Sequence, residues 1–457
     1  MDTLWIFDSA VLKETNNAVT VPGPLRKDPG NPLFTDGALS VPAVPWELLL
    51  GNGYPNVFFD SLYGKYRAYY TSYLPQENDK EIAQTYKAEE KKITGILYAE
   101  SEDGIHWIKP ALGAVSYYGN TENNIIALNT HGAGFLFDPD EPDSRKRYKI
   151  ISRNDCEPLN IHAAFSEDGI HFHSWQTVID DPRFPGDTHN FVLRDRYSGK
   201  YRLYTRTFVR EIRTEVCLSS DDFIHWSDPQ IALIGLNADD QVYGMTVFQQ
   251  DGLYWGLAEI FHFGDKTEQH YDHVEVELCY SGDGKSFQRV SPFHPFIPNG
   301  SASDFDFGTC YASAPVSDGD DLRFYYIAGN GTHYHLKQTG LCLGRIKRNR
   351  LAGITGRSDD EFTVQTRKIG IGPKELTMCV DVRGGMITYE ALDENGEVMQ
   401  GMSKDESVPI TASCDHARLC WRSGKRPEGL CMLRFYCEKA VLYSLNGDLA
   451  LHPAHPL

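Results

Sequence analysis

The sequence predicts an all-β protein, in which a five-bladed β-propeller is followed by a C-terminal β-sandwich. Three observations lead to this prediction. Short runs of β-branched and aromatic residues alternate with turns rich in Gly, Asp and Ser along most of the 457 residues, a pattern typical of antiparallel strands. One turn motif recurs at similar intervals, and beyond Leu351 the repeat gives way to a different pattern of strands.

The repeating unit is most complete in residues 186–226, where three apolar runs precede the turn SDDFIHW, which begins at Ser220. The related turns SEDGIHW, SEDGIHF and SGDGKSF begin at Ser101, Ser166 and Ser281, so successive copies are 54 to 65 residues apart. Such a period indicates units that stack around a common axis. In each turn the Asp side chain can cap backbone N–H groups, and Gly supplies a positive φ. We therefore expect these acidic residues to build the fold and not to take part in catalysis.

Five units of about 60 residues fill residues 50–350, which agrees with the four to eight blades of known propellers. They are expected to begin near Tyr54, His131, Gly186, Asp240 and Gly308. Residues up to about Trp46 are predicted to form an arm on the propeller, and the polar segment 76–92 is expected to be helical. The first domain is thus predicted to span residues 1–350, arm included. The sandwich is predicted for residues 351–457, whose length is close to the usual size of that fold.

Composition narrows the class of partner. The net charge of −19 argues against nucleic acid and anionic membranes, and a neutral, hydroxyl-rich carbohydrate fits an acidic surface better. The start MDTLWIFDSA has neither a basic region nor a long apolar core, no apolar run is long enough to span a bilayer, and the ten cysteines are scattered singly. We expect a cytoplasmic protein with reduced thiols and with neither a cofactor nor a metal ion; nothing in the sequence indicates the oligomeric state.

A propeller followed by a sandwich resembles the glycoside hydrolases of the invertase, levanase and arabinanase superfamily, which comprises families 32, 43 and 68. The most specific part is the tail, with RLAGI at Arg350 to Ile354, KELTMCVDVRGGMITYEALDENGEV at Lys374 to Val398, and the terminal run LRFYCEKAVLYSL. It is most similar to uncharacterised bacterial proteins related to family 32. The resemblance implies hydrolysis of a glycosidic bond by two carboxylates on the propeller axis, with a third acid that tunes the site.

The sequence departs from the invertases in their characteristic motifs. Neither the WMNDPNG-like motif, nor the RDP motif, nor the Glu-Cys pair is intact, and KDPGNP at Lys27 to Pro32 is only a faint version of the first. We expect Asp28 to be a loop residue. Activity on fructosides is therefore not implied.

Polar residues at the start of each inner strand are the candidates for chemistry, because the first strand of a propeller blade lines the central channel. Asp187 heads the third unit and is the predicted base or nucleophile, and Asp240 or Asp306, beside the fourth and fifth units, is expected to tune it through like-charge repulsion. Glu259 is the predicted general acid, because burial in its apolar strand would raise its pKa. The alternative is an outward-facing, solvated Glu259.

Seven further residues are predicted to contact the substrate: His189, Arg206, Tyr243, Trp255, Phe305, Glu47 and Asn56. Arg206 is expected to bind a substrate hydroxyl or to hold Asp187 ionised, with an ordinary surface arginine as the alternative. The three aromatic residues among the seven are candidates for stacking on a sugar, or else for packing within the blades.

Other classes of function remain open at this point. The histidines His189, His262, His333 and His335 suit either metal binding or, as we prefer, hydrogen bonding. A noncatalytic carbohydrate-binding propeller is one rival, because the fold alone does not choose a function. A glycoside phosphorylase is another, with Arg206, Arg210 and Arg213 as candidates for a phosphate pocket.

Overall fold

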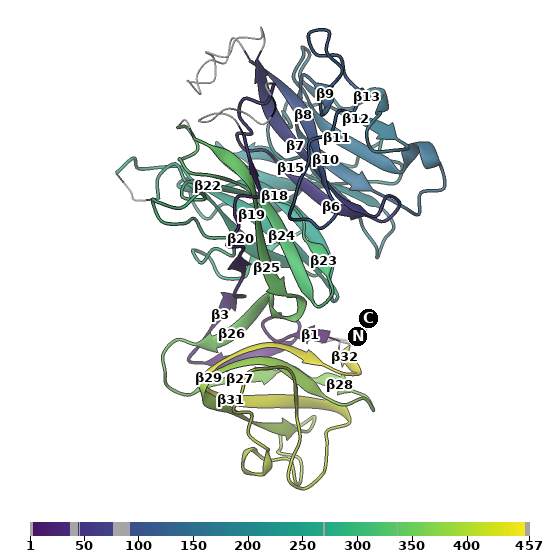
Figure 1. The fold of residues 1–457 in the computed structure, drawn as a ribbon. Helices are drawn as coiled ribbons and strands as arrows, with labels where there is room; N and C mark the ends of the chain where they lie inside the picture. Colours follow the sequence, from purple (N-terminus) through teal and green to yellow (C-terminus); the bar gives the residue numbers. More distant parts are fainter. Residues whose placement is uncertain are drawn as a thin grey trace. The chain divides into compact units, whose positions relative to one another are not determined.

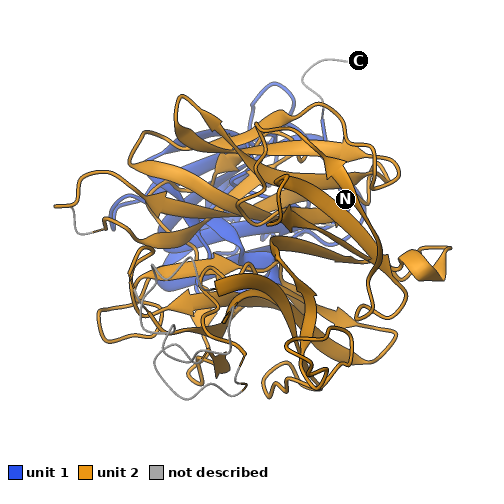
Figure 2. Ribbon diagram, turned by 90° about the horizontal axis from the view of Figure 1, so that it is seen from above, with its two compact units in different colours: residues 1–24, 250–252, 346–457 blue, residues 25–249, 253–345 orange. Residues whose placement is uncertain are grey.

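The computed structural model describes residues 3–36, 44, 46–75, 92–267, 270–335 and 337–452. Its regular elements are β-strands, apart from short 3₁₀ turns at Ser144–Lys146, Arg348–Arg350 and Lys404–Glu406. The predicted all-β class is therefore confirmed (Figure 1). The chain forms two compact units: unit 1 consists of residues 1–24, 250–252 and 346–457, and unit 2 of residues 25–249 and 253–345 (Figure 2). The segment 76–91, expected to be helical, lies outside the described residues.

Unit 2 contains three separate four-stranded antiparallel sheets, each with its strands in chain order. The first sheet comprises β6 (Asn56–Asp60), β7 (Lys65–Pro75), β8 (Lys92–Ser101) and β9 (Ile125–Leu128). The second comprises β10 (Thr130–Phe137), β11 (Tyr148–Asn154), β12 (Asn160–Ser166) and β13 (His173–Ile179). The third comprises β14 (Phe191–Arg194), β15 (Tyr201–Val209), β16 (Ile212–Ser220) and β17 (Gln230–Ile234).

The remaining strands of unit 2 belong to one ten-stranded sheet. One part comprises β18 (Asp240–Gln250), β19 (Leu253–His262), β20 (Val274–Ser281) and β21 (Gln288–Arg289). The other part comprises β22 (Thr309–Ala312), β23 (Val316–Asp318), β24 (Asp321–Gly329) and β25 (Thr339–Lys347), with β4 (Arg26–Lys27) and β5 (Phe34–Thr35) paired to β25. The two parts meet in a single parallel residue pair, Val274 with Thr309. Each part therefore has the antiparallel construction of the other three sheets.

The recurring turns shape the chain as the sequence predicted. In the turn after β12, Oδ1 of Asp168 accepts the backbone N–H groups of Ile170 and His171, at 2.8 and 2.9 Å. The same turn also joins two sheets, because the carbonyl groups of Asp168 and Gly169 accept hydrogen bonds from Arg67 and Tyr69 on β7.

Equivalent links join other sheets of unit 2. Arg202 and Tyr204 on β15 donate to the turn at Asp283 and Gly284, which follows β20. In the same way, β24 donates from Arg323 and Tyr325 to the turn at Asp103 and Gly104, which follows β8. The last strands of unit 2 are thus linked to its first sheet.

Buried amide and hydroxyl groups form hydrogen bonds that join the starts of β6, β10, β14 and β18. Asn56 on β6 donates to the carbonyl of Ala133 on β10, at 2.7 Å. Asn190 donates from its backbone and side chain to the carbonyl of Gly132, at 2.8 Å each, and Thr188 donates to the carbonyl of Tyr243 on β18, at 2.9 Å. These bonds bring residues that are up to 187 positions apart in the sequence to one place.

Unit 1 is a ten-stranded sheet in which the long strand β31 (Gly429–Asn446) pairs with five others. Its C-terminal strands are β26 (Ala352–Gly356), β27 (Phe362–Thr366), β28 (Ile369–Ile371), β29 (Thr377–Leu392), β30 (Cys414–Arg418), β31 and β32 (Leu449–Leu451). Three strands come from the other end of the chain: β1 (Thr3–Trp5), β2 (Leu12–Asn16) and β3 (Ala18–Pro22).

The placement of these N-terminal strands differs from the expectation that residues 1–46 form an arm on the first domain. β3 pairs with β26, β2 with β27 and β1 with β31, whereas only β4 and β5 pair within unit 2. The physical reason is that β26 and β27 offer backbone donors and acceptors that the N-terminal strands satisfy. Within the described residues, no helix has the length and apolar character needed to cross a membrane.

Candidate active site

A cavity of about 340 Å³ opens in unit 2 where the linked inner strands begin. Its polar walls include His131, Asp187, Arg206, Arg213 and His333. Aromatic side chains form much of the rest: Tyr54, Tyr73, Phe208, Tyr243 and Tyr334. Phe208 and Tyr334 are nearly half exposed, whereas Tyr54 and Tyr243 are buried. An aromatic wall beside a few polar groups is the usual construction of a pocket for a small molecule.

Asp187 has the only carboxylate among the described residues that line this cavity. Its side chain is 57% exposed, and three cationic groups approach it: His131 Nε2 at 3.0 Å, Arg206 Nη2 at 3.7 Å and Arg153 Nη1 at 3.8 Å. Desolvation raises the pKa of Asp187, but the hydrogen bond from His131 and the charges of Arg206, His131 and Arg153 outweigh it and hold this pKa well below its usual range. Asp187 is therefore an ionised carboxylate presented to the cavity.

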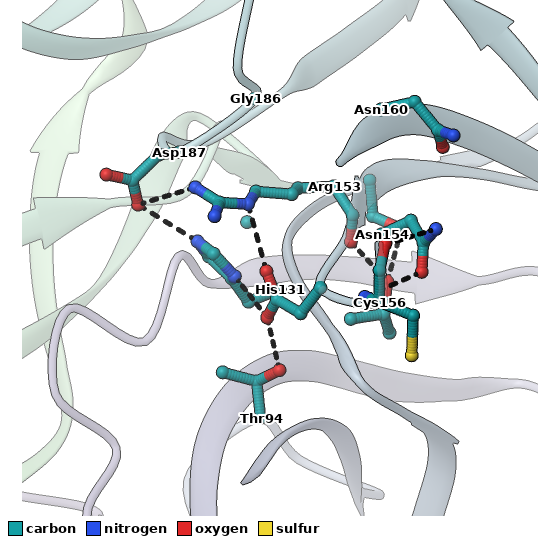
Figure 3. Close-up of polar contacts among 12 residues, drawn as sticks. Thr94, His131, Arg153, Asn154, Cys156, Asn160, Gly186 and Asp187 are labelled. Carbon is teal, nitrogen blue, oxygen red and sulfur yellow. Dashed lines mark hydrogen bonds and ion pairs between the residues drawn. The ribbon is translucent and has the colours of Figure 1, made fainter. Parts of the chain in front are cut away.

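His131 lies between the carboxylates of Asp155 and Asp187, and Figure 3 shows its contact with Asp187. Its Nδ1 atom is 2.6 Å from Asp155, which in turn accepts one hydrogen bond from Thr94 and is paired with Arg153 at 2.9 Å. Burial would lower the pKa of His131, but its hydrogen bonds with Asp155 and Asp187 raise that pKa to about 9. His131 is thus an imidazolium at neutral pH, held in one orientation by Asp155.

One face of the β15–β16 hairpin carries the arginines of the cavity. Phe208 lies opposite Arg213 in the strand register, and Arg206 lies opposite Glu215. Because side chains alternate between the two faces of a strand, these four project to the same side. The guanidinium carbons of Arg206 and Arg213 lie 4.7 and 5.7 Å from the ring centroid of Tyr243. Both cations therefore stack near one aromatic ring.

Two carboxyl groups are buried beside this cationic wall, and neither lines the cavity. Glu215 is fully buried and its two carboxylate oxygens have no hydrogen-bond partner among the described residues. Burial, together with nearby Glu259, raises the pKa of Glu215 well above its usual value, against a lowering by Arg206. Burial also raises the pKa of Glu259 to about 8, against smaller effects of the Ala312 backbone and Arg206. Burial therefore favours the protonated form of both groups, and Glu259, with a pKa of about 8, is mainly protonated at neutral pH.

The position of Glu259 depends on Gly244 of β18. A Cβ atom at position 244 would lie 2.9 Å from Oε2 of Glu259 and 3.1 Å from Oγ1 of Thr188. The carboxyl group of Glu259 thus lies close to the residue that follows Asp187 in the chain. The alternative of a solvated, outward-facing Glu259 is wrong, because its side chain is fully buried.

Asp187, Arg206 and Tyr243 are the predicted site residues that the structure brings together at the cavity. Asp240 heads β18 as expected, but Arg289 binds both of its oxygens, at 2.7 and 3.0 Å, and it does not line the cavity. Asp306 also lies outside the lining, where it pairs with Lys27 at 2.5 Å. The expectation that these two acids share a channel with Asp187 is therefore not met by the structure.

The other predicted substrate contacts lie in the packing of unit 2 and outside the cavity lining. His189 and Asn56 are buried, with Nε2 of His189 3.3 Å from Oδ1 of Asn56. Glu47 is buried against Lys109, at 2.7 Å. Trp255 is fully buried in a stacked arrangement with Phe248. The ring of Phe305 lies against Gly340.

The candidate metal histidines are hydrogen bonders in the structure. Nδ1 of His333 is 3.0 Å from the hydroxyl of Tyr311, and Nε2 of His262 is 3.0 Å from Glu275. The THYH segment forms a turn and not a strand, so His333 is buried while His335 is exposed. Within the described ranges, no group of three or more His, Cys, Asp or Glu side chains is arranged to hold a metal ion.

The sequence reasoning missed His131, Arg153 and Asp155. His131 could have been found, because it begins the second repeating unit and the rule that selected Asp187 applies equally to it. Arg153 could also have been found, because RYKIISR at 147–153 aligns with KYRLYTR at 200–206 and gives Arg153 the position of Arg206. Asp155, just beyond the end of β11, had no such signal.

No family model and no curated protein sequence matches the chain. Among solved structures, it is similar to an N-acetylgalactosamine deacetylase from F. plautii at 15% identity and a TM-score of 0.48, over 75% of this chain and 97% of that one. It is similar to a β-1,2-mannobiose phosphorylase from Listeria innocua at 14% identity and a TM-score of 0.49, over 71% and 96%. It is also similar to a thermostable family-43 glycoside hydrolase at 16% identity and a TM-score of 0.48, over 68% and 95%.

Proposed function

We propose that unit 2 is a five-bladed propeller that binds and cleaves a glycoside in the cavity around Asp187. The observation that carries the proposal is an ionised carboxylate, more than half exposed, set between aromatic walls and fixed by an imidazolium. Aromatic faces suit the apolar faces of sugar rings, and the carboxylate suits the positive charge that develops at the anomeric carbon. In the five-bladed arrangement, the two antiparallel parts of the ten-stranded sheet are the fourth and fifth blades.

Asp187 is the group proposed to act at the anomeric carbon. Because its pKa is held low, it is charged throughout the neutral range and is a better nucleophile or charge stabiliser than proton donor. In hydrolysis the bond from the anomeric carbon to the leaving oxygen breaks while Asp187 attacks or stabilises that carbon, and the leaving oxygen takes up a proton. A water molecule then adds its oxygen to the anomeric carbon, which breaks the bond to Asp187 where one has formed, and its proton returns to the group that protonated the leaving oxygen.

Asp187 and His131 are too close together to be the two catalytic groups that flank the glycosidic bond in a glycosidase. Their hydrogen bond is 3.0 Å long, whereas the two carboxyl groups of retaining glycosidases are about 5–5.5 Å apart and those of inverting ones about 6.5–9.5 Å apart. We propose that His131 positions and polarises Asp187, and that Glu259 remains the candidate for the proton donor. Its protonated state supports this role, although its carboxyl group is set back from the cavity lining.

The experiment that tests this function measures sugar release from aryl furanosides, aryl pyranosides and plant oligosaccharides, with and without inorganic phosphate. The Asp187→Asn variant is compared with Asp221→Asn, which removes an exposed carboxylate outside the cavity. We expect release by the wild type and by Asp221→Asn, and loss of at least a hundredfold in Asp187→Asn. A requirement for phosphate would identify a phosphorylase. Sugar binding without release from any substrate would indicate a noncatalytic binding protein and contradict the proposal.

A further inference from the structure

We propose that the cavity contains a subsite for an oxyanion, formed by Arg206 and Arg213, which takes a carboxylate carried by the sugar or inorganic phosphate. The proposal rests on the proposed function, because it names the chemical class of ligand that the same cavity accepts. It departs from the neutral carbohydrate that the overall acidity of the chain suggests.

The charge of the cavity wall is opposite to that of the whole chain. The guanidinium groups of Arg206 and Arg213 and the imidazole of His131 line the cavity, against the single described carboxylate of Asp187. That one carboxylate is shared among three cationic groups, since His131 donates to it and Arg206 and Arg153 lie 3.7 and 3.8 Å from it. The electrostatic potential is therefore expected to be positive in the cavity although the protein as a whole is acidic, which favours an anionic ligand there.

The surroundings of Arg213 give the clearest indication of an anion-binding site. Its guanidinium donates to the neutral amide oxygen of Gln241 at 2.7 Å, and no carboxylate of a described residue lies within 4.0 Å of it. Its Nε atom is buried and has no hydrogen-bond partner in the described part of the chain. Aromatic rings surround the group, with centroids between 5.2 and 5.9 Å from the guanidinium carbon: Phe208, Tyr243, Phe261 and Phe263.

Arg206 is more deeply buried than Arg213 and, within the described chain, also has an unsatisfied hydrogen-bond donor. Its side chain is 3% exposed, and its Nε atom is buried without a partner among the described residues. Asp187 is the one described carboxylate within ion-pair range, at 3.7 Å, which is too long for a hydrogen bond. Glu215, directly opposite on the next strand, makes no ion pair with it. A buried cation whose counter-charge is 3.7 Å away and shared with two other cations is only partly compensated, and an arriving oxyanion reduces the remaining penalty.

One ligand can reach both arginines. Their guanidinium carbons lie within 6 Å of the same Tyr243 ring, and both residues line the same cavity. Guanidinium groups bind carboxylate and phosphate oxygens through paired N–H donors, which a neutral hydroxyl group does not match. The arrangement therefore selects an oxyanion over a neutral substituent at this end of the cavity.

Isothermal titration calorimetry tests the subsite without turnover. Inorganic phosphate, glucuronate and glucose are titrated into the full-length protein in a buffer free of other oxyanions. We expect at least one of the two anions to bind ten times more tightly than glucose, and its affinity to fall as sodium chloride is added. In Arg213→Gln that affinity falls at least tenfold. Arg210, which was also predicted for a phosphate pocket, is exposed in the turn of the same hairpin and lies outside the cavity lining. Arg210→Gln is therefore the matched control and leaves the affinity unchanged.

The outcomes distinguish a sugar carboxylate from inorganic phosphate as the ligand, and they test the oxyanion subsite separately from the proposed glycoside cleavage. Tight binding of glucuronate but not phosphate indicates an acidic sugar, whereas phosphate binding together with phosphate-dependent sugar release indicates phosphorolysis. The subsite is rejected if neither anion binds more tightly than glucose, or if Arg210→Gln weakens binding as much as Arg213→Gln. Asp187→Asn is expected to abolish turnover but to strengthen anion binding. Anion binding by a wild-type protein without turnover would reject the proposed function alone.

Discussion

His131 and Asp187 are joined by a hydrogen bond of 3.0 Å between Nε2 and Oδ1, and the other ring nitrogen of His131 is 2.6 Å from Asp155. A single imidazole therefore bridges the exposed carboxylate of Asp187 in the cavity and the largely buried carboxylate of Asp155. Its positive charge stabilises both. The pH dependence of stability and activity should follow the protonation of this histidine.

The first prediction concerns the loss of this charge at high pH. The pKa of His131 is raised in the folded protein to about 9, above its unfolded value of about 6.5. Its contribution to stability is therefore complete below about pH 6.5 and is lost as pH rises through about 9. We expect His131→Gln to destabilise unit 2 by about 2 kcal/mol at pH 6 and by much less at pH 9.5. Urea unfolding at both pH values measures this difference. His173→Gln, at an exposed histidine, serves as the control, and an equal loss for His131→Gln at both pH values would contradict the prediction.

The second prediction tests Glu259 as the proton donor. Its pKa of about 8 means that the acid form, and with it activity on substrates that need a proton donor, declines as pH rises above about 8. We expect Glu259→Gln to lower kcat/KM at least a hundredfold for alkyl glycosides. For 4-nitrophenyl glycosides the loss should be under tenfold, because that leaving group departs without a proton. A similar loss on both kinds of substrate would assign Glu259 to packing and not to proton transfer.

The third prediction compares a neutral buried carboxyl group with an ionic one. Burial raises the pKa of Glu215 and favours its protonated form, which has the same shape and charge as glutamine. Glu215→Gln should therefore change the free energy of unfolding by less than about 1 kcal/mol at pH 7. Asp240 is paired with Arg289 through both oxygens, so Asp240→Asn should cost about 3 kcal/mol. Chemical denaturation of the two variants measures the contrast. A larger cost for Glu215→Gln than for Asp240→Asn would show that Glu215 carries a charge.

The fourth prediction concerns the turns that join the sheets. Gly169 has φ +77°, and a Cβ atom there would lie 2.6 Å from Nη1 of Arg67 and 2.7 Å from the hydroxyl of Tyr69. Gly199 has φ +73°, with nothing within 4 Å of its Cβ position. Gly199→Ala therefore measures the backbone strain alone, at about 1 kcal/mol. Gly169→Ala should cost at least about 2 kcal/mol, because it also displaces the link between sheets. Equal shifts in thermal unfolding would mean that the link contributes little.

The repeated turns and strands could be predicted from the sequence because they depend on local signals. Ser, Asp and Gly at fixed offsets specify the turn whatever lies nearby, and Asp168 and Asp283 accept the backbone N–H groups that their spacing implies. The pairing of β1 to β3 with C-terminal strands could not be predicted in this way. Strand pairing over more than 300 residues leaves no local pattern when each strand is short.

Residues of the candidate site could be predicted only where position at the start of a repeating unit was sufficient to identify them. Asp187 was found from its place before an inner strand, but Asp240 satisfies the same rule and is instead bound by Arg289, which comes 49 residues later. Nothing near Asp240 in the sequence reveals that partner. Glu259 was expected to be buried with a raised pKa because its strand is apolar, and both features are present. Its distance from the cavity lining depends on the neighbouring strand and could not be foreseen.

The hydrogen bonds between neighbouring sheets also depend on the order of the repeats along the chain. Arg and Tyr two positions apart occur on β7, β15 and β24, and in each case the partner is an Asp-Gly turn of another sheet. The turn at Asp222 has Phe223 in place of Gly, and β11, in the second sheet, carries no Arg-x-Tyr pair. Where the donor pair is absent, the glycine of the next turn is therefore absent as well. An insertion, loss or shuffling of one repeat would separate a donor pair from its acceptor turn, so side-chain complementarity constrains the number and order of the copies.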